Sequence, residues 1–487
     1  MRRRTLIVGL TVLAVLVASG GFVVGWQLLP SAADRPETVP SKRPSPSASQ
    51  GKAQPWQDRP EVQLQYDIAA DHESASGVEE VAFTPDRKVC DWLVFRAWPN
   101  KPELARHGGA MTVDEAEVAG AEVDPQVERR GAPAGAPGTL VKLPLESCVG
   151  AGDTVRARLE FTVEMAKGSG DRVGTHRGEM WFASAYPVLA WERGHGWMVD
   201  PAVDVFGEMD GSEEFRLDLE VVAPARDSVL GTGRSLGTAD GPRPGTMRHR
   251  FAADSVRNVA VSAGGYAVTE RVIDGVRTRV GVPAEGAESG GKAWLDAVEA
   301  AMGRLQDRFG RFPYRDLWVT VVPDDTTGIE FPGAIFYGDA SPPEVSRSEV
   351  VGHELAHMWF YSLVGNNQGR DPWLDEAFAT YAQALADGQQ AAYLADAPMP
   401  DAAKNRVGEP MTYWADHPDD YGTGVYRQGA TMLFEARQQV GKRKWDAAMR
   451  VYLTKHAHQL VRSDDFVAAV DHLPGAVRTL EKYGAVD

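Results

Sequence analysis

The stretch V-G-H-E-L-A-H-M-W-F, residues 351–360, decides the fold of this chain of 487 residues. Its two histidines, His353 and His357, are four residues apart, so on a helix they lie on one face and both rings can reach one metal ion. The residues around them are apolar on every side, which predicts a buried helix. Two histidines and Glu354 are costly to bury unless a partner satisfies them. Zinc does so, because it binds imidazole nitrogen at about 2.0–2.1 Å.

A zinc ion of the catalytic type needs a third protein ligand and leaves its fourth position to water. The segment W-L-D-E-A-F-A-T-Y, residues 373–381, supplies Glu376, with 18 residues between it and His357. That spacing lets the first helix end, the chain turn and a second helix return alongside. Asp375 competes for the role, but one residue is about 100° of helix rotation, so only one of the two faces the ion. Asp375 can instead hydrogen-bond a ligand histidine.

The composition excludes some partners and some kinds of site. The formal net charge of −17 argues against a nucleic acid partner, because phosphate binding needs a basic surface. Cys90 and Cys148 are the two cysteines of the chain, too few for a four-cysteine zinc site. For an exported chain, a disulfide between them is the natural interpretation, and two separate buried thiols are the alternative.

The N-terminal segment, residues 1–29, predicts where the protein goes. Residues 2–4 are arginines and precede an uncharged, mostly apolar run over residues 5–29. This run is longer than the apolar core of a signal peptide, about 7–15 residues, and favours an uncleaved membrane anchor with the arginines in the cytoplasm. We therefore expect a single-pass cell-membrane protein with an extracytoplasmic catalytic domain. Secretion after signal cleavage is the alternative, since small residues occur at 18–20 and 31–33.

The remaining sequence divides into three parts, in line with a length that predicts two or three domains. Residues 30–59 are rich in Pro and Ser and predict a linker. Residues 60–280 contain short alternating runs, such as 158–163, and predict an antiparallel β domain. Residues 281–487 predict a mainly helical catalytic domain. There we expect strands over 317–322 and 334–337 and helices over about 292–309, 344–364, 372–386, 425–440, 442–455 and from 463 onward.

Together these motifs resemble the gluzincin metallopeptidases of the aminopeptidase N type. That family has His-Glu-x-x-His, 18 residues, and then Glu inside Trp-Leu-Asn-Glu-Gly-Phe-Ala, which is Trp-Leu-Asp-Glu-Ala-Phe-Ala here. Residues 426–430, Tyr-Arg-Gln-Gly-Ala, are similar to the family's Tyr-Glu-Lys-Gly-Ala. The resemblance is strong over about 329–441 and weaker at 186–187 and 256–258. It implies a multi-domain α+β fold, in which an N-terminal antiparallel β saddle or sandwich domain precedes a thermolysin-like, mainly helical zinc peptidase domain.

The resemblance also implies roles for individual residues. Zinc held by His353, His357 and Glu376 would act as a Lewis acid and lower the pKa of a water molecule. Glu354 would take a proton from that water and pass it to the leaving amine. Tyr426 would donate a hydrogen bond to the developing oxyanion. The alternative for Tyr426 is a core tyrosine on an amphipathic helix.

Glu330 distinguishes an exopeptidase from an endopeptidase. Aminopeptidases of this family carry Gly-x-Met-Glu-Asn on a strand beside the cleft, and its Glu pairs with the free α-amino group of the substrate. Residues 327–333 read T-G-I-E-F-P-G here, so Glu330 is kept and Phe331 replaces the Asn. An ordinary surface glutamate is the alternative for Glu330. We expect Phe331 to remove a polar group from the pocket and to change its specificity.

These residues predict a zinc aminopeptidase that trims the N-termini of peptides or proteins. The two alternatives are an extracytoplasmic zinc endopeptidase and a membrane-tethered binding protein with a vestigial site. The sequence ends at Asp487, 111 residues after Glu376, without the β sandwich and large helical domain of longer family members. We therefore expect a more open site that admits longer peptides.

Overall fold

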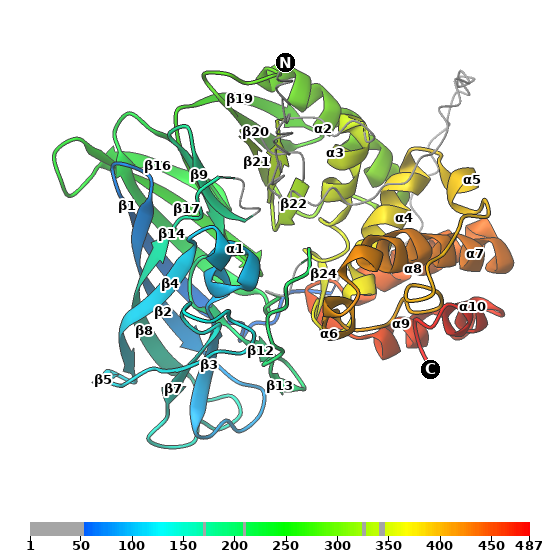
Figure 1. Cartoon of the computed structure of the whole chain (residues 1–487), viewed down its shortest axis with the longest axis horizontal. Helices are drawn as coiled ribbons and strands as arrows, with labels where there is room; N and C mark the ends of the chain where they lie inside the picture. Colours follow the sequence, from blue (N-terminus) through cyan, green and yellow to red (C-terminus); the bar gives the residue numbers. More distant parts are fainter. Residues whose placement is uncertain (1–52, 169–171, 208–210, 324–327, 340–345) are drawn as a thin grey trace, which may run out of the picture.

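The computed structural model describes residues 53–168, 172–207, 211–323, 328–339 and 346–487 (Figure 1). The predicted membrane anchor and most of the predicted linker lie outside these ranges. Within them, no helix is both long enough and apolar enough to cross a membrane. A β-rich N-terminal part and a helical C-terminal part lie side by side (Figure 1), as the predicted fold class requires.

An eight-stranded sheet forms the largest element of the β domain. Its strands are β1 (Glu61–Ile68), β2 (Ser74–Phe83), β4 (Ala110–Val118), β5 (Ala121–Glu122), β8 (Val155–Glu164), β14 (Phe215–Pro224), β16 (Arg234–Asp240) and β17 (Thr246–Val256). The order is β16-β17-β14-β1-β2-β8-β4-β5, and the pairs are antiparallel except that β1 runs parallel to β14. The alternation predicted over residues 158–163 is confirmed, because inward side chains of β8 are buried and their neighbours are not.

The β domain also contains a hairpin of β12 (Trp191–Glu192) and β13 (Gly196–Trp197) and two four-stranded sheets. One has the order β15-β18-β10-β9 and the other β11-β3-β7-β6. Their strands are β3 (Trp92–Arg96), β6 (Gln126–Glu128), β7 (Leu140–Pro144), β9 (Val173–His176), β10 (Glu179–Ala183), β11 (Val188–Leu189), β15 (Ser228–Gly231) and β18 (Ala260–Gly264). A disulfide joins Cys90, before β3, to Cys148, after β7, and so closes one end of this antiparallel pair. This is the pairing that we expect for an exported chain.

A five-stranded sheet supports the helical part. Its strands are β19 (Tyr266–Ile273), β20 (Val276–Pro283), β21 (Asp316–Val322), β22 (Gly328–Phe331) and β23 (Ala334–Gly338), in the order β19-β20-β21-β23-β22. The strands predicted over 317–322 and 334–337 are confirmed as β21 and β23. The predicted domain boundary after residue 280 falls inside β20. Strand β22, which carries Glu330, is an edge strand of this sheet.

The helices follow the predicted order. Those of the C-terminal part are α2 (Gly291–Phe309), α3 (Arg347–Ala356), α4 (Glu376–Ala386), α5 (Gln390–Tyr393), α6 (Met411–Ala415), α7 (Gln428–Val440), α8 (Lys442–Lys455), α9 (Ser463–Val470) and α10 (Ala476–Lys482), and the short helix α1 (Pro102–Arg106) lies in the β domain. Short 3₁₀ turns lie at Pro372–Leu374 and Pro418–Asp420, and a π-helix lies at Gly422–Arg427. The helix predicted over 442–455 is confirmed.

The predicted bounds of three helices were wrong. The helix expected over 344–364 ends at Ala356, and Tyr361, with φ of 114°, turns the chain toward β24 (Val364–Asn366). A sequence that is apolar on all sides fits a buried turn as well as a buried helix, so its pattern does not locate this end. The helix expected over 425–440 begins as the π-helix, and the one expected from 463 onward is divided into α9 and α10.

Buried and half-buried ion pairs join the two parts of the molecule. Glu192 of the β domain accepts hydrogen bonds from Arg462 at 2.7 and 3.0 Å and from Arg370 at 3.3 Å. Asp200, also of the β domain, accepts hydrogen bonds from Arg370 at 3.3 Å and from Asn367 at 3.1 Å. The loop between β24 and α4 is therefore fixed to the β domain at both of these acids.

A second contact fixes the segment that follows α3. The guanidinium group of Arg257, which is 1% exposed, donates hydrogen bonds to the carbonyl oxygens of Ser362 at 3.2 Å and Ser212 at 2.9 Å. Glu214 lies 3.5 Å from Arg257 and 2.9 Å from Nδ1 of His458. Residues of the β domain thus bind the backbone next to the histidine helix.

Glu79 on β2 is a buried acid in the core of the β domain. Its side chain has 0% exposure, and neither carboxyl oxygen has a hydrogen-bond partner in the described part of the chain. Burial raises the pKa of Glu79 well above its ordinary value, because a carboxylate is costly in an apolar environment.

We predict that Glu79→Gln stabilises the protein more at pH 8 than at pH 5. The folded chain keeps the proton of Glu79 to a higher pH than the unfolded chain, which ionises this group near pH 4.5. Stability is therefore lost as the pH rises from 4.5 toward the raised folded pKa, by at most about 1.4 kcal/mol per pH unit. Glutamine cannot ionise, so its advantage in the free energy of unfolding should grow with pH. Urea unfolding at both pH values measures this, and an equal advantage at both would contradict it.

Candidate metal centre

Helix α3 carries the first two residues of the site and has a well-defined start. The Ser346 hydroxyl accepts a hydrogen bond from the backbone N–H of Glu349 at 3.3 Å, and the Glu349 carboxylate accepts one from the backbone N–H of Ser346 at 2.9 Å. This capping box fixes the first turn. His353 lies in the last turn, and His357 directly follows the helix with nearly helical angles, φ −60° and ψ −17°. The predicted spacing of one turn is therefore present.

Three potential ligand atoms form a small triangle. Nε2 of His353 lies 3.2 Å from Nε2 of His357 and 3.2 Å from Oε2 of Glu376, and the third side measures 3.5 Å. All three side chains are buried. A tetrahedral ion with bonds of about 2.0–2.1 Å needs its ligand atoms about 3.3–3.4 Å apart. The triangle therefore has the size that zinc requires, and Glu376, the first residue of α4, supplies the third ligand as predicted.

The charges around the triangle favour a cation. Burial lowers the pKa of His357, but Glu330, Asp375 and Glu376 outweigh burial and raise it well above its ordinary value. Burial likewise raises the pKa of Glu376, yet His357 and His353 hold it well below its ordinary value. The carboxylates thus stabilise positive charge at the histidines, and a zinc ion supplies that charge.

Asp375 is not a fourth member of the triangle. Its Oδ1 accepts a hydrogen bond from Nδ1 of His357 at 2.6 Å, and its Oδ2 accepts one from Nε2 of Gln368 at 2.7 Å. The alternative that the sequence left open, a carboxylate that orients a ligand histidine, is the one observed. Sequence reasoning missed Gln368, because no motif marks it.

Glu354 lies against the edge strand β22. A Cβ atom at Gly328 would come within 2.5 Å of Cγ and Oε1 of Glu354, so this close approach needs glycine. Burial raises the pKa of Glu354 to about 8, with His357 opposing the rise and Glu376 and Asp375 adding to it. A carboxylate with a raised pKa is a better proton acceptor near neutral pH.

The side chains of Glu330 and Phe331 lie in different environments. Glu330 is 2% exposed, and its Oε1 lies 3.8 Å from Nδ1 of His357, so it is not a surface glutamate. Phe331 is also buried, but its ring packs edge-on against Phe336, with ring centroids 5.1 Å apart, in the apolar core that continues into the β domain. The expectation that Phe331 removes a polar group from the pocket was therefore wrong, because neighbouring strand residues face opposite sides.

Tyr426 lies beside the first histidine. Its ring stacks on the ring of His353, with centroids 5.8 Å apart and an interplanar angle of 16°, and the ring of Tyr421 packs edge-on against it. Both tyrosines belong to or adjoin the π-helix, an irregularity that often occurs at functional sites. The structure thus brings Tyr426 to the metal centre, and its role as a hydrogen-bond donor stays a prediction.

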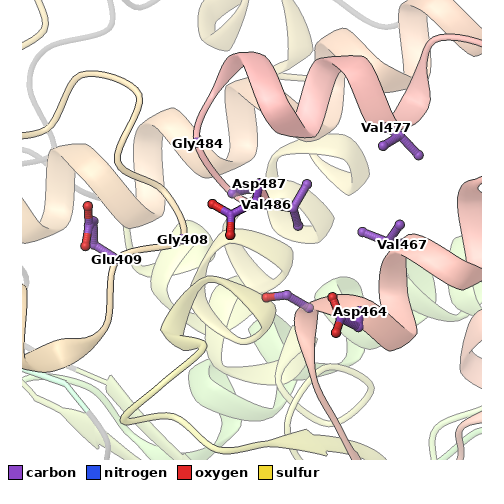
Figure 2. Close-up of a pocket in the computed structure, with 10 residues that line it drawn as sticks. Gly408, Glu409, Asp464, Val467, Val477, Gly484, Val486 and Asp487 are labelled. Atoms are coloured by element: carbon purple, nitrogen blue, oxygen red, sulfur yellow. The ribbon is translucent and has the colours of Figure 1, made fainter.

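A separate surface pocket of about 410 Å³ lies near α9 and α10 (Figure 2). None of the predicted site residues lines it. Its lining residues are Gly408, Glu409, Ser463, Asp464, Val467, Val477, Gly484, Ala485, Val486 and Asp487. Carboxylates are its main charged groups, and acidic residues alone do not define a binding site.

Comparison with known proteins places this geometry in a family. The model of the peptidase family M1 domain matches residues 311–482, which include α3, α4 and the π-helix. Aminopeptidase N of Streptomyces lividans is 31% identical over 149 residues, which cover 26% of this chain and 17% of that protein. Aminopeptidase M1-C of Oryza sativa subsp. japonica is 26% identical over 218 residues, which cover 39% of this chain and 24% of that protein. The chain therefore matches less than a quarter of the length of these relatives.

Solved structures share the whole two-part fold. The M1 zinc metallopeptidase from Deinococcus radiodurans superposes with a TM-score of 0.64 at 18% sequence identity, over 90% of this chain and 96% of that chain. A mutant of the M1 zinc metallopeptidase from the same organism, bound to a Tyr-Ser-Ala substrate, gives a TM-score of 0.63 at 18% identity, over 88% of this chain and 96% of that one.

The family match and the ligand triangle fall on the same helices of the helical part. Residues 311–482 thus resemble the domain of peptidase family M1, and the fold of the chain resembles the two-domain M1 structures.

We predict that removal of zinc lowers the melting temperature of the purified protein by about 5–10 °C. A ligand present at about 100 times its dissociation constant stabilises the folded state by about 2.7 kcal/mol. For a domain of this size, each kcal/mol raises the melting temperature by about 2–4 °C. Differential scanning calorimetry with and without a chelator measures the difference. Glu376→Gln should lose most of this zinc-dependent increment, and an unchanged increment in that variant would contradict the ligand assignment.

Proposed function

We propose that this protein is a zinc-dependent aminopeptidase that removes residues from the N-termini of peptides. The observation that carries the proposal is the buried carboxylate of Glu330, with Oε1 3.8 Å from Nδ1 of the zinc ligand His357. A buried carboxylate attracts a cation, and the cation that a peptide can offer close to its first peptide bond is the α-ammonium group.

The known relatives support peptides as substrates. The two matched proteins from Streptomyces lividans and Oryza sativa are named as aminopeptidases, and the mutant M1 enzyme from Deinococcus radiodurans holds a Tyr-Ser-Ala substrate. These likenesses come from partial matches or from the fold, so the activity of this chain rests on its own residues.

The residues around the triangle divide the chemistry between them. Bound zinc supplies Lewis-acid polarisation of the substrate carbonyl group and lowers the pKa of water. Glu354, with a pKa that burial raises to about 8, takes a proton from the attacking water and passes it to the leaving amine. The Tyr426 phenol donates a hydrogen bond to the carbonyl oxygen as negative charge develops there. Glu330 binds the α-ammonium group, so the first peptide bond is the one attacked.

We also propose that the catalytic domain works outside the cytoplasm and is tethered to the membrane by residues 1–29. The arginines at 2–4, the apolar run that follows them and the Cys90–Cys148 disulfide support this location. Secretion after cleavage of the same segment would leave the chemistry unchanged.

We predict that a free N-terminus is required for cleavage. Rates on an aminoacyl nitroanilide should exceed those on its N-acetylated counterpart by about 10²-fold or more, because loss of a buried charge partner costs about 2–5 kcal/mol. Glu330→Gln should lower kcat/KM on the free substrate by a similar factor, mainly through KM, and leave the slow reaction of the blocked one unchanged. Equal rates on free and blocked substrates would identify an endopeptidase instead.

Glu354→Gln is the matched control for this experiment. It should abolish cleavage of both substrates while zinc content and melting temperature stay the same, since Glu354 is not a ligand. Wild-type protein that binds zinc, is folded and cleaves neither substrate would refute the proposed function.

A further inference from the structure

Gln368 is a buried polar residue without a role in the proposed chemistry. Its side chain is 2% exposed, and its amide nitrogen Nε2 donates a hydrogen bond to Oδ2 of Asp375 at 2.7 Å. The other oxygen of the same carboxylate, Oδ1, accepts a hydrogen bond from Nδ1 of His357 at 2.6 Å. The two hydrogen bonds therefore connect Gln368 to a zinc ligand through one intervening side chain.

We propose that Gln368 is a positioning residue of the zinc site, which acts on His357 through Asp375. A carboxylate held at one oxygen cannot rotate freely, so its other oxygen stays directed at the imidazole. A hydrogen bond accepted from Nδ1–H selects the tautomer in which Nε2 carries the free lone pair, and it also fixes the plane of the ring. Gln368 thus keeps the lone pair of His357 directed at the centre of the ligand triangle.

The loop that carries Gln368 is fixed to the β domain. Asn367 donates a hydrogen bond to Asp200 at 3.1 Å, and its own side-chain oxygen accepts hydrogen bonds from the backbone N–H groups of Gly369 at 3.0 Å and Arg370 at 3.2 Å. Arg370 reaches Asp200 and Glu192 of the β domain. The backbone on both sides of Gln368 is therefore held, and the β domain contributes to the geometry of a metal site that lies in the other part of the molecule.

A merely structural role is the competing explanation, and Gln383 provides the matched control. This glutamine on α4 has 0% exposure, and its Nε2 donates a hydrogen bond to Oδ2 of Asp387 at 2.7 Å, the same distance as in the pair of Gln368 and Asp375. Asp387 has no hydrogen bond or ion pair with a zinc ligand within the described ranges. Replacing Gln368 by leucine removes one buried amide–carboxylate hydrogen bond, and replacing Gln383 removes a part-buried one together with a hydrogen bond to Gln389 at 3.1 Å, so both variants should lose folding stability.

Zinc affinity distinguishes the two explanations. We expect Gln368→Leu to weaken zinc binding by about 10–100-fold, as is typical when the partner of a ligand histidine is disturbed, and Gln383→Leu to change it by less than about threefold. The measurement is competition of the purified full chain with a chromophoric chelator for zinc. Unchanged affinity in Gln368→Leu, or an equal loss in both variants, would overturn the proposal. If Gln368→Leu does not fold, the shorter Gln368→Asn, which cannot reach Asp375, takes its place under the same criteria.

A double-mutant cycle tests whether Gln368 acts through Asp375. In an Asp375→Ala background, the further change Gln368→Leu should alter zinc affinity by less than about twofold, because the connecting carboxylate is already absent. Independent, multiplicative losses would contradict the proposed connection. The inference rests on the zinc site alone and is measured as binding, so it can fail or hold whether or not the aminopeptidase proposal is right.

Discussion

The ligand triangle of His353, His357 and Glu376 places three electron-rich atoms within 3.5 Å of one another in a buried space. Such a cluster is costly to bury unless a cation occupies its centre. The apolar packing around it sets the spacing. Phe378 of α4 stacks on Phe360 at 4.9 Å between ring centroids and on Trp373 at 5.8 Å, so the start of α4 is held against the end of α3. The hydrophobic core therefore supplies the free energy that holds the ligands close together.

The polar side chains around the ligand triangle are chemically similar but make different contacts. Besides the ligand Glu376, three carboxylates and one amide lie near the two histidines, and their contacts differ. Asp375 orients His357, Gln368 orients Asp375, and Glu354 is pressed against Gly328 on the edge strand. Glu330 on the same strand lies 3.8 Å from Nδ1 of His357. The β domain holds the loop and the turn that carry this arrangement, through Asp200 and Arg257.

The sequence predicted the ligands because their spacing is local. The spacing of four residues within one helix predicts His353 and His357. The first turn of a second helix predicts Glu376, and neither prediction needs the rest of the fold. The end of α3 could not be predicted, since Tyr361 turns the chain within a stretch that is apolar throughout. Gln368 could not be found either, because its position depends on contacts between the loop and Asp200, which lies far away in sequence. Phe331 was assigned to the pocket by analogy with a motif, whereas strand alternation directs it into the core.

The central claim, that two imidazoles and one carboxylate of this chain hold a zinc ion, can be tested directly by anomalous X-ray diffraction at the zinc absorption edge. The account predicts one anomalous peak at about 2.0–2.1 Å from Nε2 of His353, Nε2 of His357 and a carboxylate oxygen of Glu376. A crystal of zinc-loaded protein without a peak at this triangle, or with the ion bound instead between Glu330 and Glu354, would contradict it.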